Sequence, residues 1–274
     1  MQLDDLFSRA NELPSIPEVV QELIASFDNN SVDADDIGRK IAMDQVLTVK
    51  VLRLANSARY GRSRNVSSVN EAVVRLGINQ IRTLVLASSF TGAFKAPPGF
   101  DLKGFWQDSF QIAELGRWLA GFSDEEVETV FTTGMVSNIG RLLVHMSLPE
   151  KAQEIDRVVA KGGNRNEMEQ IAWGFTSDDA SAGVASKWKF PERIVSGVKF
   201  QSHPWDATDD SQIASLVYLA KYLNDGLKKD TPDETLIAQF PNEIARDAGV
   251  DLSRMLDNLS HIHDLDSGLG DLLN

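Results

Sequence analysis

Residues 51–61 read Val51-Leu52-Arg53-Leu54-Ala55-Asn56-Ser57-Ala58-Arg59-Tyr60-Gly61, and they decide how the rest of the chain is interpreted. From Val46 to Leu54 the apolar residues recur at helical spacing, which predicts a short helix. Asp44 stands where a carboxylate can accept hydrogen bonds from the first free N–H groups of that helix. Asn56 and Ser57 favour helix ends because their side chains compete for backbone hydrogen bonds.

Helical periodicity continues on both sides of this stretch. Upstream, apolar residues recur from Val19 to Phe27, and downstream Ser68 with Glu71 forms the pattern of a capping box. Further helical segments are expected at about residues 102–121, 124–146, 148–161, 165–174, 177–188 and 191–202, followed by a helical tail over 207–274 with polar breaks at 228–232 and around Asn242. No alternating strand pattern is found, so the sequence predicts an all-α fold.

One segment interrupts the helical pattern decisively. Lys95-Ala96-Pro97-Pro98-Gly99 cannot lie inside a helix, because proline lacks the N–H donor and clashes with the preceding turn. We therefore predict an N-terminal helical lobe over residues 1–94, packed on a larger helical lobe over residues 100–274 that includes a C-terminal helical extension.

Composition excludes several classes of protein. The 274 residues can bury a sizeable core, and the net charge of −13 argues against non-specific nucleic-acid binding and against a basic membrane-binding module. The absence of cysteine excludes disulfides, cysteine zinc sites, iron–sulfur clusters and thiol nucleophiles. Neither a targeting signal nor an apolar run long enough to span a bilayer is found, so a cytoplasmic protein is expected.

The charge is unevenly distributed. Between Gln45 and Lys95 there are eight basic residues and one acidic residue, Glu71, so this segment carries +7 and the rest of the chain −20. Such a basic segment either pairs with the acidic remainder across the lobe interface or binds an anionic partner. The composition alone leaves both alternatives open.

The motifs of the chain resemble the HDOD domain, the HD-related output domain of bacterial signalling proteins. The resemblance covers about residues 10–205. It rests on the stretch 51–61 and on residues in matching order and spacing: Leu13-Pro14-Ser15-Ile16-Pro17, Asp44, Val66-Ser67-Ser68-Val69, Leu76-Gly77, Phe105-Trp106, Ile139-Gly140-Arg141-Leu142, Trp188 and Phe190-Pro191.

This resemblance implies an all-α protein in which a smaller N-terminal bundle packs on a larger bundle related to the HD phosphohydrolases. In those enzymes the larger bundle holds divalent metals with His and Asp ligands. In HDOD proteins the ligands are usually incomplete and the domain acts in regulation. The ligand positions of this chain therefore decide between an enzyme and a regulatory module.

At each ligand position that the resemblance implies, this chain departs from the enzymes. Asp108 stands where the first His would be, and Ser137-Asn138 replaces the paired His-Asp. Ser177 occupies the third position, and Gln201-Ser202 the fourth. Neutral oxygen donors bind divalent transition metals poorly, so no catalytic metal and no cofactor are expected. A residual Mg²⁺ or Ca²⁺ site at Asp108, Asp178 or Asp179 stays open.

The resulting prediction is a non-catalytic signal-transduction or scaffold module that binds a protein partner in a signalling pathway or an anionic small ligand. The alternative is a divergent metal-dependent phosphohydrolase of the HD superfamily. The four histidines, His145, His203, His261 and His263, are expected at the surface, and they do not supply the missing ligands.

The basic segment supplies the candidate binding residues. Arginine suits phosphate or carboxylate because its planar fork can bind two oxygens at once. We predict a surface for an anionic partner, with hydrogen bonds and a stacking face added by the neighbouring polar residues. Its members are Arg53, Asn56, Arg59, Tyr60, Arg62 and Arg64. The competing interpretations are ion pairs with acids of the second lobe and, for Asn56, a backbone contact at the helix end.

Overall fold

The computed structural model describes residues 3–9, 16–25, 27, 34–57, 65–208 and 211–273. Within these residues every regular element is a helix, which confirms the all-α prediction. None of the helices described is long and apolar enough to cross a membrane.

The helices of the first half of the chain are α1 (Leu3–Arg9), α2 (Glu18–Ala25), α3 (Ala34–Met43), α4 (Gln45–Ala55), α5 (Val69–Leu76), α6 (Ile78–Ala93), α7 (Leu102–Ala120) and α8 (Val127–Val136). The second half adds α9 (Ile139–Ser147), α10 (Pro149–Val159), α11 (Arg165–Trp173), α12 (Ser177–Lys187), α13 (Glu192–Lys199), α14 (Ser211–Lys228), α15 (Asp233–Ala238), α16 (Asn242–Asp247) and α17 (Leu252–Asp257). Three 3-10 helices are η1 (Pro204–Asp206), η2 (Leu259–Asp264) and η3 (Gly270–Leu273).

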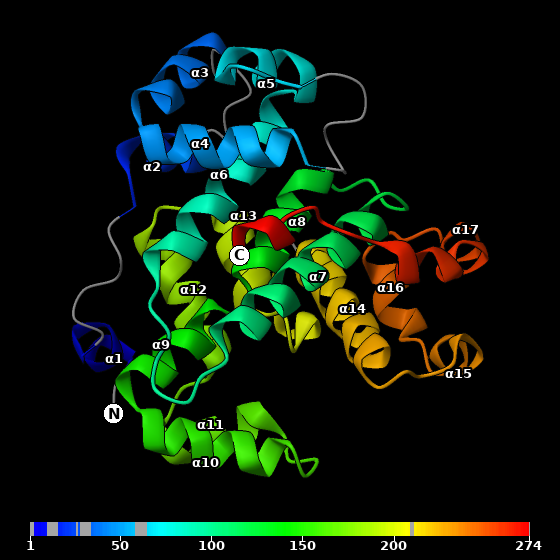
Figure 1. Ribbon diagram of the computed structural model, residues 1–274. Coiled ribbons are helices and arrows are strands. Elements are labelled where there is room, and N and C mark those ends of the chain that lie inside the picture. The colour runs from blue at the N-terminus through cyan, green and yellow to red at the C-terminus, as the bar shows by residue number, and fades with distance from the viewer. Residues whose placement is uncertain are drawn as a thin grey trace.

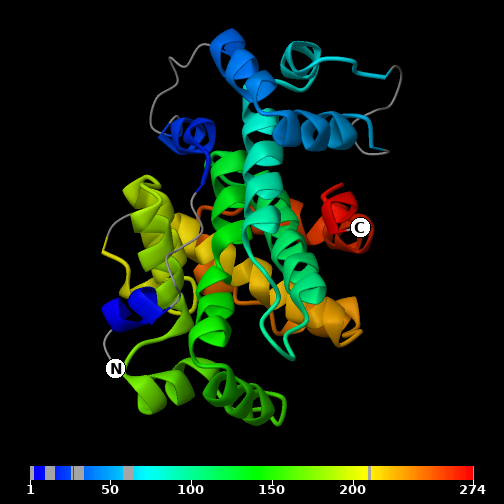
Figure 2. The ribbon, with the colours of Figure 1, turned by 60° about the vertical axis from the view of Figure 1, so that its left-hand side comes forward.

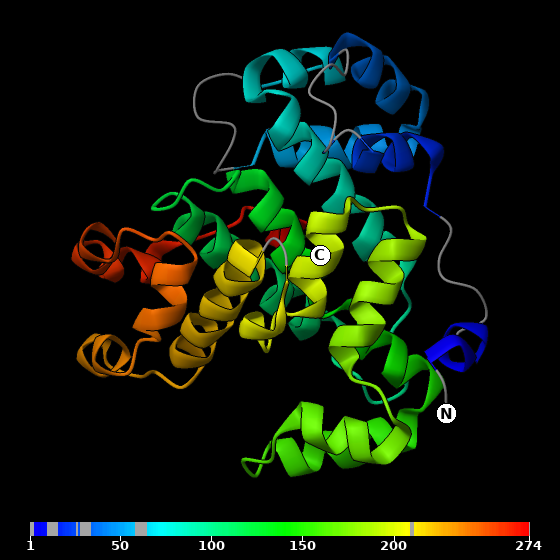
Figure 3. The ribbon, with the colours of Figure 1, turned by 180° about the vertical axis from the view of Figure 1, so that it is seen from behind.

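Helices α2 to α5 form a small bundle above a larger one, and α6 runs from the first into the second (Figures 1 and 2). A continuous hydrophobic core includes Leu54 of α4, Phe90 of α6, Phe131 of α8 and Trp188 beyond α12. The rings of Phe90 and Trp188 stack with centroids 4.8 Å apart. A second core lies between α7, α14 and the C-terminal helices α15 to α17. Figure 3 shows α14 to α17 from behind.

Local sequence signals explain where these helices begin and end. The carboxylate of Asp44 accepts hydrogen bonds from the N–H groups of Val46 and Leu47, as predicted. The hydroxyl of Ser68 accepts from the N–H of Glu71, but the Glu71 carboxylate accepts from the N–H of Ser67, one residue earlier than in a capping box. Residues 95–99 are outside any helix, as their prolines require.

The segment predicted as one helix over 124–146 is two helices, α8 and α9. The break falls at Ser137 and Asn138. The hydroxyl of Ser137 donates to the carbonyl of Gly134 at 2.8 Å, so the side chain satisfies a carbonyl that a continuing helix would use. The chain then turns, and Gly140 lies close against α12, where the hydroxyl of Ser181 accepts its N–H.

Candidate functional site

A polar cavity of about 240 Å³ lies in the larger bundle, between α7, the α8–α9 turn, α11, α12 and α14. Five of the six predicted ligand positions line it, although they are distant in sequence: Asp108, Ser137, Asn138, Ser177 and Ser202. Five positions that the family resemblance picked out of the sequence thus surround a single cavity of the fold.

Gln201, the sixth position, lies beneath the cavity wall rather than on it. Its side chain is fully buried, and its amide nitrogen donates to the carbonyls of Ser137 and Val198, both at 2.8 Å. Gln201 therefore attaches the α8–α9 turn to α13. Its role in this structure is to hold Ser137 in position.

Ser177 faces the cavity but is already bound. Its N–H and its hydroxyl both donate to the buried carboxylate of Glu169, at 2.5 Å each. Arg165 contacts the same carboxylate at 3.3 Å. Glu169 thus connects α11 to the N-terminus of α12, where negative charge is favoured. Asp179, one of the open cation ligands, instead accepts from the N–H and hydroxyl of Thr176 in a capping box.

Sequence reasoning missed the basic side chains of the cavity. Four line it, Arg141, Arg165, Lys221 and Lys228, together with the acids Asp108, Asp178 and Asp225. Lys228 forms an ion pair with Asp108 at 2.6 Å. A signal was present, because Lys221, Asn224 and Lys228 are spaced three and four residues apart and so share one face of a helix. The sequence does not show which face of the tail helix meets the ligand positions.

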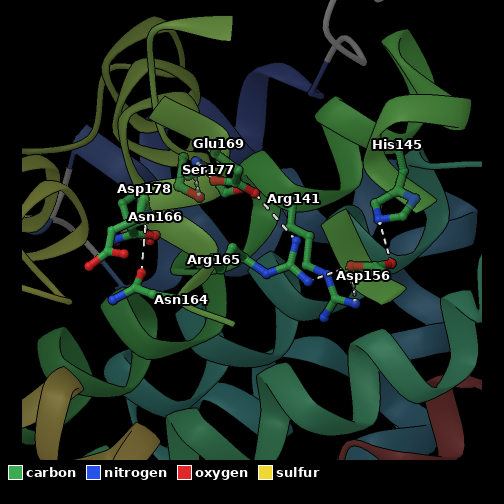
Figure 4. Close-up of polar contacts among 11 residues, drawn as sticks. Arg141, His145, Asp156, Asn164, Arg165, Asn166, Glu169, Ser177 and Asp178 are labelled. Carbon is green, nitrogen blue, oxygen red and sulfur yellow. Dashed lines mark hydrogen bonds and ion pairs between the residues drawn. The ribbon is translucent and has the colours of Figure 1, made fainter. Parts of the chain in front are cut away.

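The carboxylate of Asp156 on α10 contacts three basic side chains beside the cavity (Figure 4). Its carboxylate contacts Arg165, the guanidinium of Arg141 at 3.4 Å and the imidazole of His145 at 3.0 Å. His145 is 3% exposed and packs against the Phe100 ring at 4.5 Å. The predicted surface position of His145 is therefore wrong, because its imidazole packs against Phe100 and contacts Asp156, eleven residues away in sequence.

The surroundings of Asp156 also set its pKa. Burial alone would raise the pKa of this carboxyl, but the hydrogen bonds from His145 and Arg165 and the charge of Arg141 outweigh it, so the pKa lies well below its usual range. The folded-state pKa is thus below the unfolded value of about 3.9. The carboxylate contributes stability that is present above that value and is lost as the pH falls toward the folded-state pKa.

We expect Asp156→Asn to remove this pH dependence. Below about pH 4 the free energy of unfolding of the wild type should fall with an additional slope of up to about 1.4 kcal/mol per pH unit, which the variant lacks. Urea unfolding between neutral and acidic pH measures the slope. Asp247→Asn, which changes an exposed carboxylate on α16, is the control and should keep the wild-type slope. If the free energies of unfolding of wild type and Asp156→Asn fell with the same slope below about pH 4, the lowered pKa of Asp156 would be contradicted.

The positive charges of Lys221 and Arg141 in the cavity are only partly balanced by nearby carboxylates. Burial lowers the pKa of Lys221, and the carboxylates of Asp178 and Asp225 offset this only in part. Burial also lowers the pKa of Arg141, and the neighbouring charge of Arg165 lowers it further. Loss of water disfavours the charged form of both groups, so an additional negative charge in the cavity would stabilise them.

The structure describes only two of the six residues of the predicted basic surface, Arg53 and Asn56. Arg53 is exposed on α4. The Asn56 amide donates to the carbonyls of Leu52 and Val66 and accepts from the N–H of Val66, so it joins the end of α4 to Val66. Arg59, Tyr60, Arg62 and Arg64 lie outside the described residues. Arg82, also in the basic segment, is buried and lies over the Phe27 ring at 4.4 Å.

The donor set of the cavity does not suit the divalent metals of HD enzymes. The cavity offers the hydroxyls of Ser137, Ser177 and Ser202, the amide of Asn138 and three aspartates but no imidazole, and two arginines and two lysines add positive charge. Within the part of the chain that the structure describes, no three His, Cys, Asp or Glu side chains gather as a metal site would require.

Comparison with known proteins agrees with this fold. A provisionally named phosphohydrolase from Shewanella amazonensis SB2B is 34% identical, with a TM-score of 0.83 over 98% of both chains. An HDOD domain protein of unknown function from Geobacter sulfurreducens is 20% identical, with a TM-score of 0.79 over 100% of this chain and 99% of its own. The second likeness shows the fold alone.

A curated relative, an uncharacterized protein of Treponema pallidum (strain Nichols), is 23% identical over 235 residues. The match covers 83% of this chain, which spans 45% of that relative's length. The family model described as HDOD domain matches residues 13–204. Since this match covers well over half of the sequence, the chain belongs to the HDOD domain family.

Proposed function

We propose that this chain is a non-catalytic regulatory module of HDOD type, which has lost the metal ligands of the HD enzymes. The observation that supports the proposal is the lining of the cavity, where serine, asparagine, lysine and arginine together outnumber three aspartates around the predicted ligand positions. A cation brought among these side chains would meet like charge from Arg141, Lys221 and Lys228. The module acts by binding, either to a signalling partner or to an anionic ligand.

The competing function is a divergent metal-dependent phosphohydrolase. The provisional name of the Shewanella amazonensis protein, which is 34% identical over nearly the whole chain, favours it. Such an enzyme would need its metal to be held by Asp108 with Asp178 or Asp225, the carboxylates of the cavity. Asp108 is already paired with Lys228, and Asp178 accepts a hydrogen bond from Asn166 at 3.0 Å, so both would have to exchange partners.

Elemental analysis combined with a hydrolysis assay separates the two functions. Protein purified without chelator is expected to contain Zn, Fe and Mn far below one ion per chain. Its hydrolysis of p-nitrophenyl phosphate and bis(p-nitrophenyl) phosphate with added Mn²⁺ should equal the rate without protein. Asp108→Asn should leave both results unchanged.

One combination of results would establish the phosphohydrolase instead. It is a stoichiometric transition metal together with turnover that Asp108→Asn abolishes. Turnover that persists in Asp108→Asn would identify a contaminating enzyme, so the variant serves as the control for purity. An HD phosphohydrolase assayed in parallel shows that the conditions support activity.

A further inference from the structure

Lys221 is the least compensated charge of the cavity. It projects from the middle of α14, is largely buried, and lines the cavity. Among the described residues its ammonium group makes no hydrogen bond or ion pair within normal distance, and Asp178 and Asp225 act on it only through space. The ammonium group lines the cavity without an acceptor from the described residues, so the cavity has room for an acceptor that enters from outside.

Neutral donors of the cavity are also unused. Asn224, three residues after Lys221 on α14, is 4% exposed and lines the cavity, and its side-chain amide makes no hydrogen bond to a described residue. On the opposite wall Asn138 precedes α9 without capping it. Asn138 lines the cavity, whereas the N–H of Gly140 at the start of α9 already donates to the hydroxyl of Ser181.

Two of the three acids that line the cavity have close polar partners, and Asp178 and Asp225 act on Lys221 only through space. Asp108 pairs with Lys228, and Asp178 accepts from the side-chain amide of Asn166. Asp225 lies exposed on α14. Asp156, the partner of Arg141, lies beside the cavity at a distance of 3.4 Å from that guanidinium. Lys221 and Arg141 therefore face the cavity with less negative charge than they would need for full compensation.

A phosphate group matches this arrangement. Its oxygens accept several hydrogen bonds from different directions, and both the planar guanidinium of arginine and the ammonium of lysine bind it well. A second cavity of about 480 Å³ shares Asp108, Arg141 and Lys228 with the first. It continues outward along α7 and includes Phe100 and Gln107. The remainder of a phosphorylated small molecule can lie in this second space.

We propose that the cavity binds the phosphate group of a small phosphorylated molecule, with Lys221, Asn224 and Arg141 as hydrogen-bond donors. This inference rests on the proposed function, because in a metal-dependent phosphohydrolase the same space would hold the metal. Free phosphate and a phosphate ester both present the phosphate group that the cavity would bind. The adjoining cavity distinguishes them, since only an ester would fill it.

The test is isothermal titration calorimetry in phosphate-free buffer, on protein whose metal content has been measured. The probes are inorganic phosphate, AMP and adenosine. Phosphate and AMP are expected to bind and adenosine is not. Lys221→Met should raise the dissociation constant for AMP by at least about tenfold, as expected for loss of a hydrogen bond to a charged group. Lys229→Met, an exposed lysine just beyond α14, should bind as wild type does.

Stability measurements separate binding from a structural role. If Lys221 serves the ligand, Lys221→Met removes an uncompensated buried charge, and the unliganded variant should unfold at the same or a higher temperature than wild type. Asn224→Asp keeps the size of the side chain and adds negative charge, so it should weaken AMP binding even if Lys221→Met folds poorly. Both variants binding AMP with wild-type affinity would overturn the site.

Other outcomes distinguish this inference from the proposed function. If metal-free protein binds neither phosphate nor AMP at millimolar concentration, the phosphate site is wrong and the proposed function stands. If phosphate binds only to protein that carries stoichiometric metal, both are wrong. Tighter binding of AMP than of phosphate identifies an ester as the source of the group, and equal affinities identify free phosphate.

Discussion

Replacing Arg117 with methionine is expected to lower the free energy of unfolding by about 3–5 kcal/mol, because it breaks buried ion pairs and leaves two carboxylates without a partner. Arg117 of α7 is 11% exposed and contacts Glu114 at 2.7 Å and Glu128 at 2.9 Å. Its guanidinium also lies over the Phe131 ring at 3.7 Å. Methionine keeps much of the contact with this ring, so the loss reports mainly on the charge.

This ion network joins the two bundles. Glu128 of α8 accepts a hydrogen bond from the hydroxyl of Thr83, at 2.5 Å, and Thr83 lies on α6, the helix that enters the larger bundle from the smaller one. The free energy of unfolding is measured with urea. The triple variant Arg117→Met, Glu114→Gln, Glu128→Gln should recover part of the loss, because neutral amides are less costly to bury than unpaired carboxylates.

Arg254 provides a matched control. It too lies over a phenylalanine ring, Phe122, and approaches an acid three residues away, Asp251, but it is 69% exposed. Arg254→Met should therefore change the free energy of unfolding by less than about 1 kcal/mol. Similar losses for Arg117→Met and Arg254→Met would show that burial of the network contributes nothing.

Replacing Gly140 with alanine is expected to cost about 1–3 kcal/mol or more, although alanine is the better helix former. A Cβ atom at this position would lie much closer than van der Waals contact to the Ser177 carbonyl oxygen and the Ser181 nitrogen, and 2.8 Å from the Cβ of Ala180. Two of these three atoms belong to the backbone of α12, so rotating a side chain cannot relieve the contact.

Urea unfolding of Gly140→Ala measures this cost. Gly270→Ala is the control, since a Cβ there would meet no atom within 4 Å. The separation of α9 from α12 should also disturb the cavity, because Ser177 and Arg141 lie on opposite sides of this contact. A Gly140→Ala protein that is as stable as wild type would show that the two helices can separate without cost.

Most of the local structure follows from the sequence. Apolar spacing predicted the helices, Asp44 predicted a helix start that its carboxylate caps, and the prolines at 97 and 98 predicted a non-helical link. These signals act between residues a few positions apart, so they need no knowledge of packing. The order of motifs also predicted the family and the positions around the cavity, because proteins that share these motifs share one fold.

Other features were decided only when distant helices met. His145 and Asp156 are each ordinary in sequence, yet packing of α9 against α10 makes one a buried partner of the other. Asn56 is bonded to Val66, ten residues away, and the guanidinium of Arg82 lies over the ring of Phe27.

The lining of the cavity shows the same division. The sequence by itself determined that Ser137, Asn138 and Ser177 offer only hydroxyl and amide donors, since residue identity alone decides which donors are available. Only the tertiary structure decided that α14 turns Lys221 and Lys228 toward those positions. Electrostatic interaction depends on distance and on burial, and neither quantity is defined until the helices are packed.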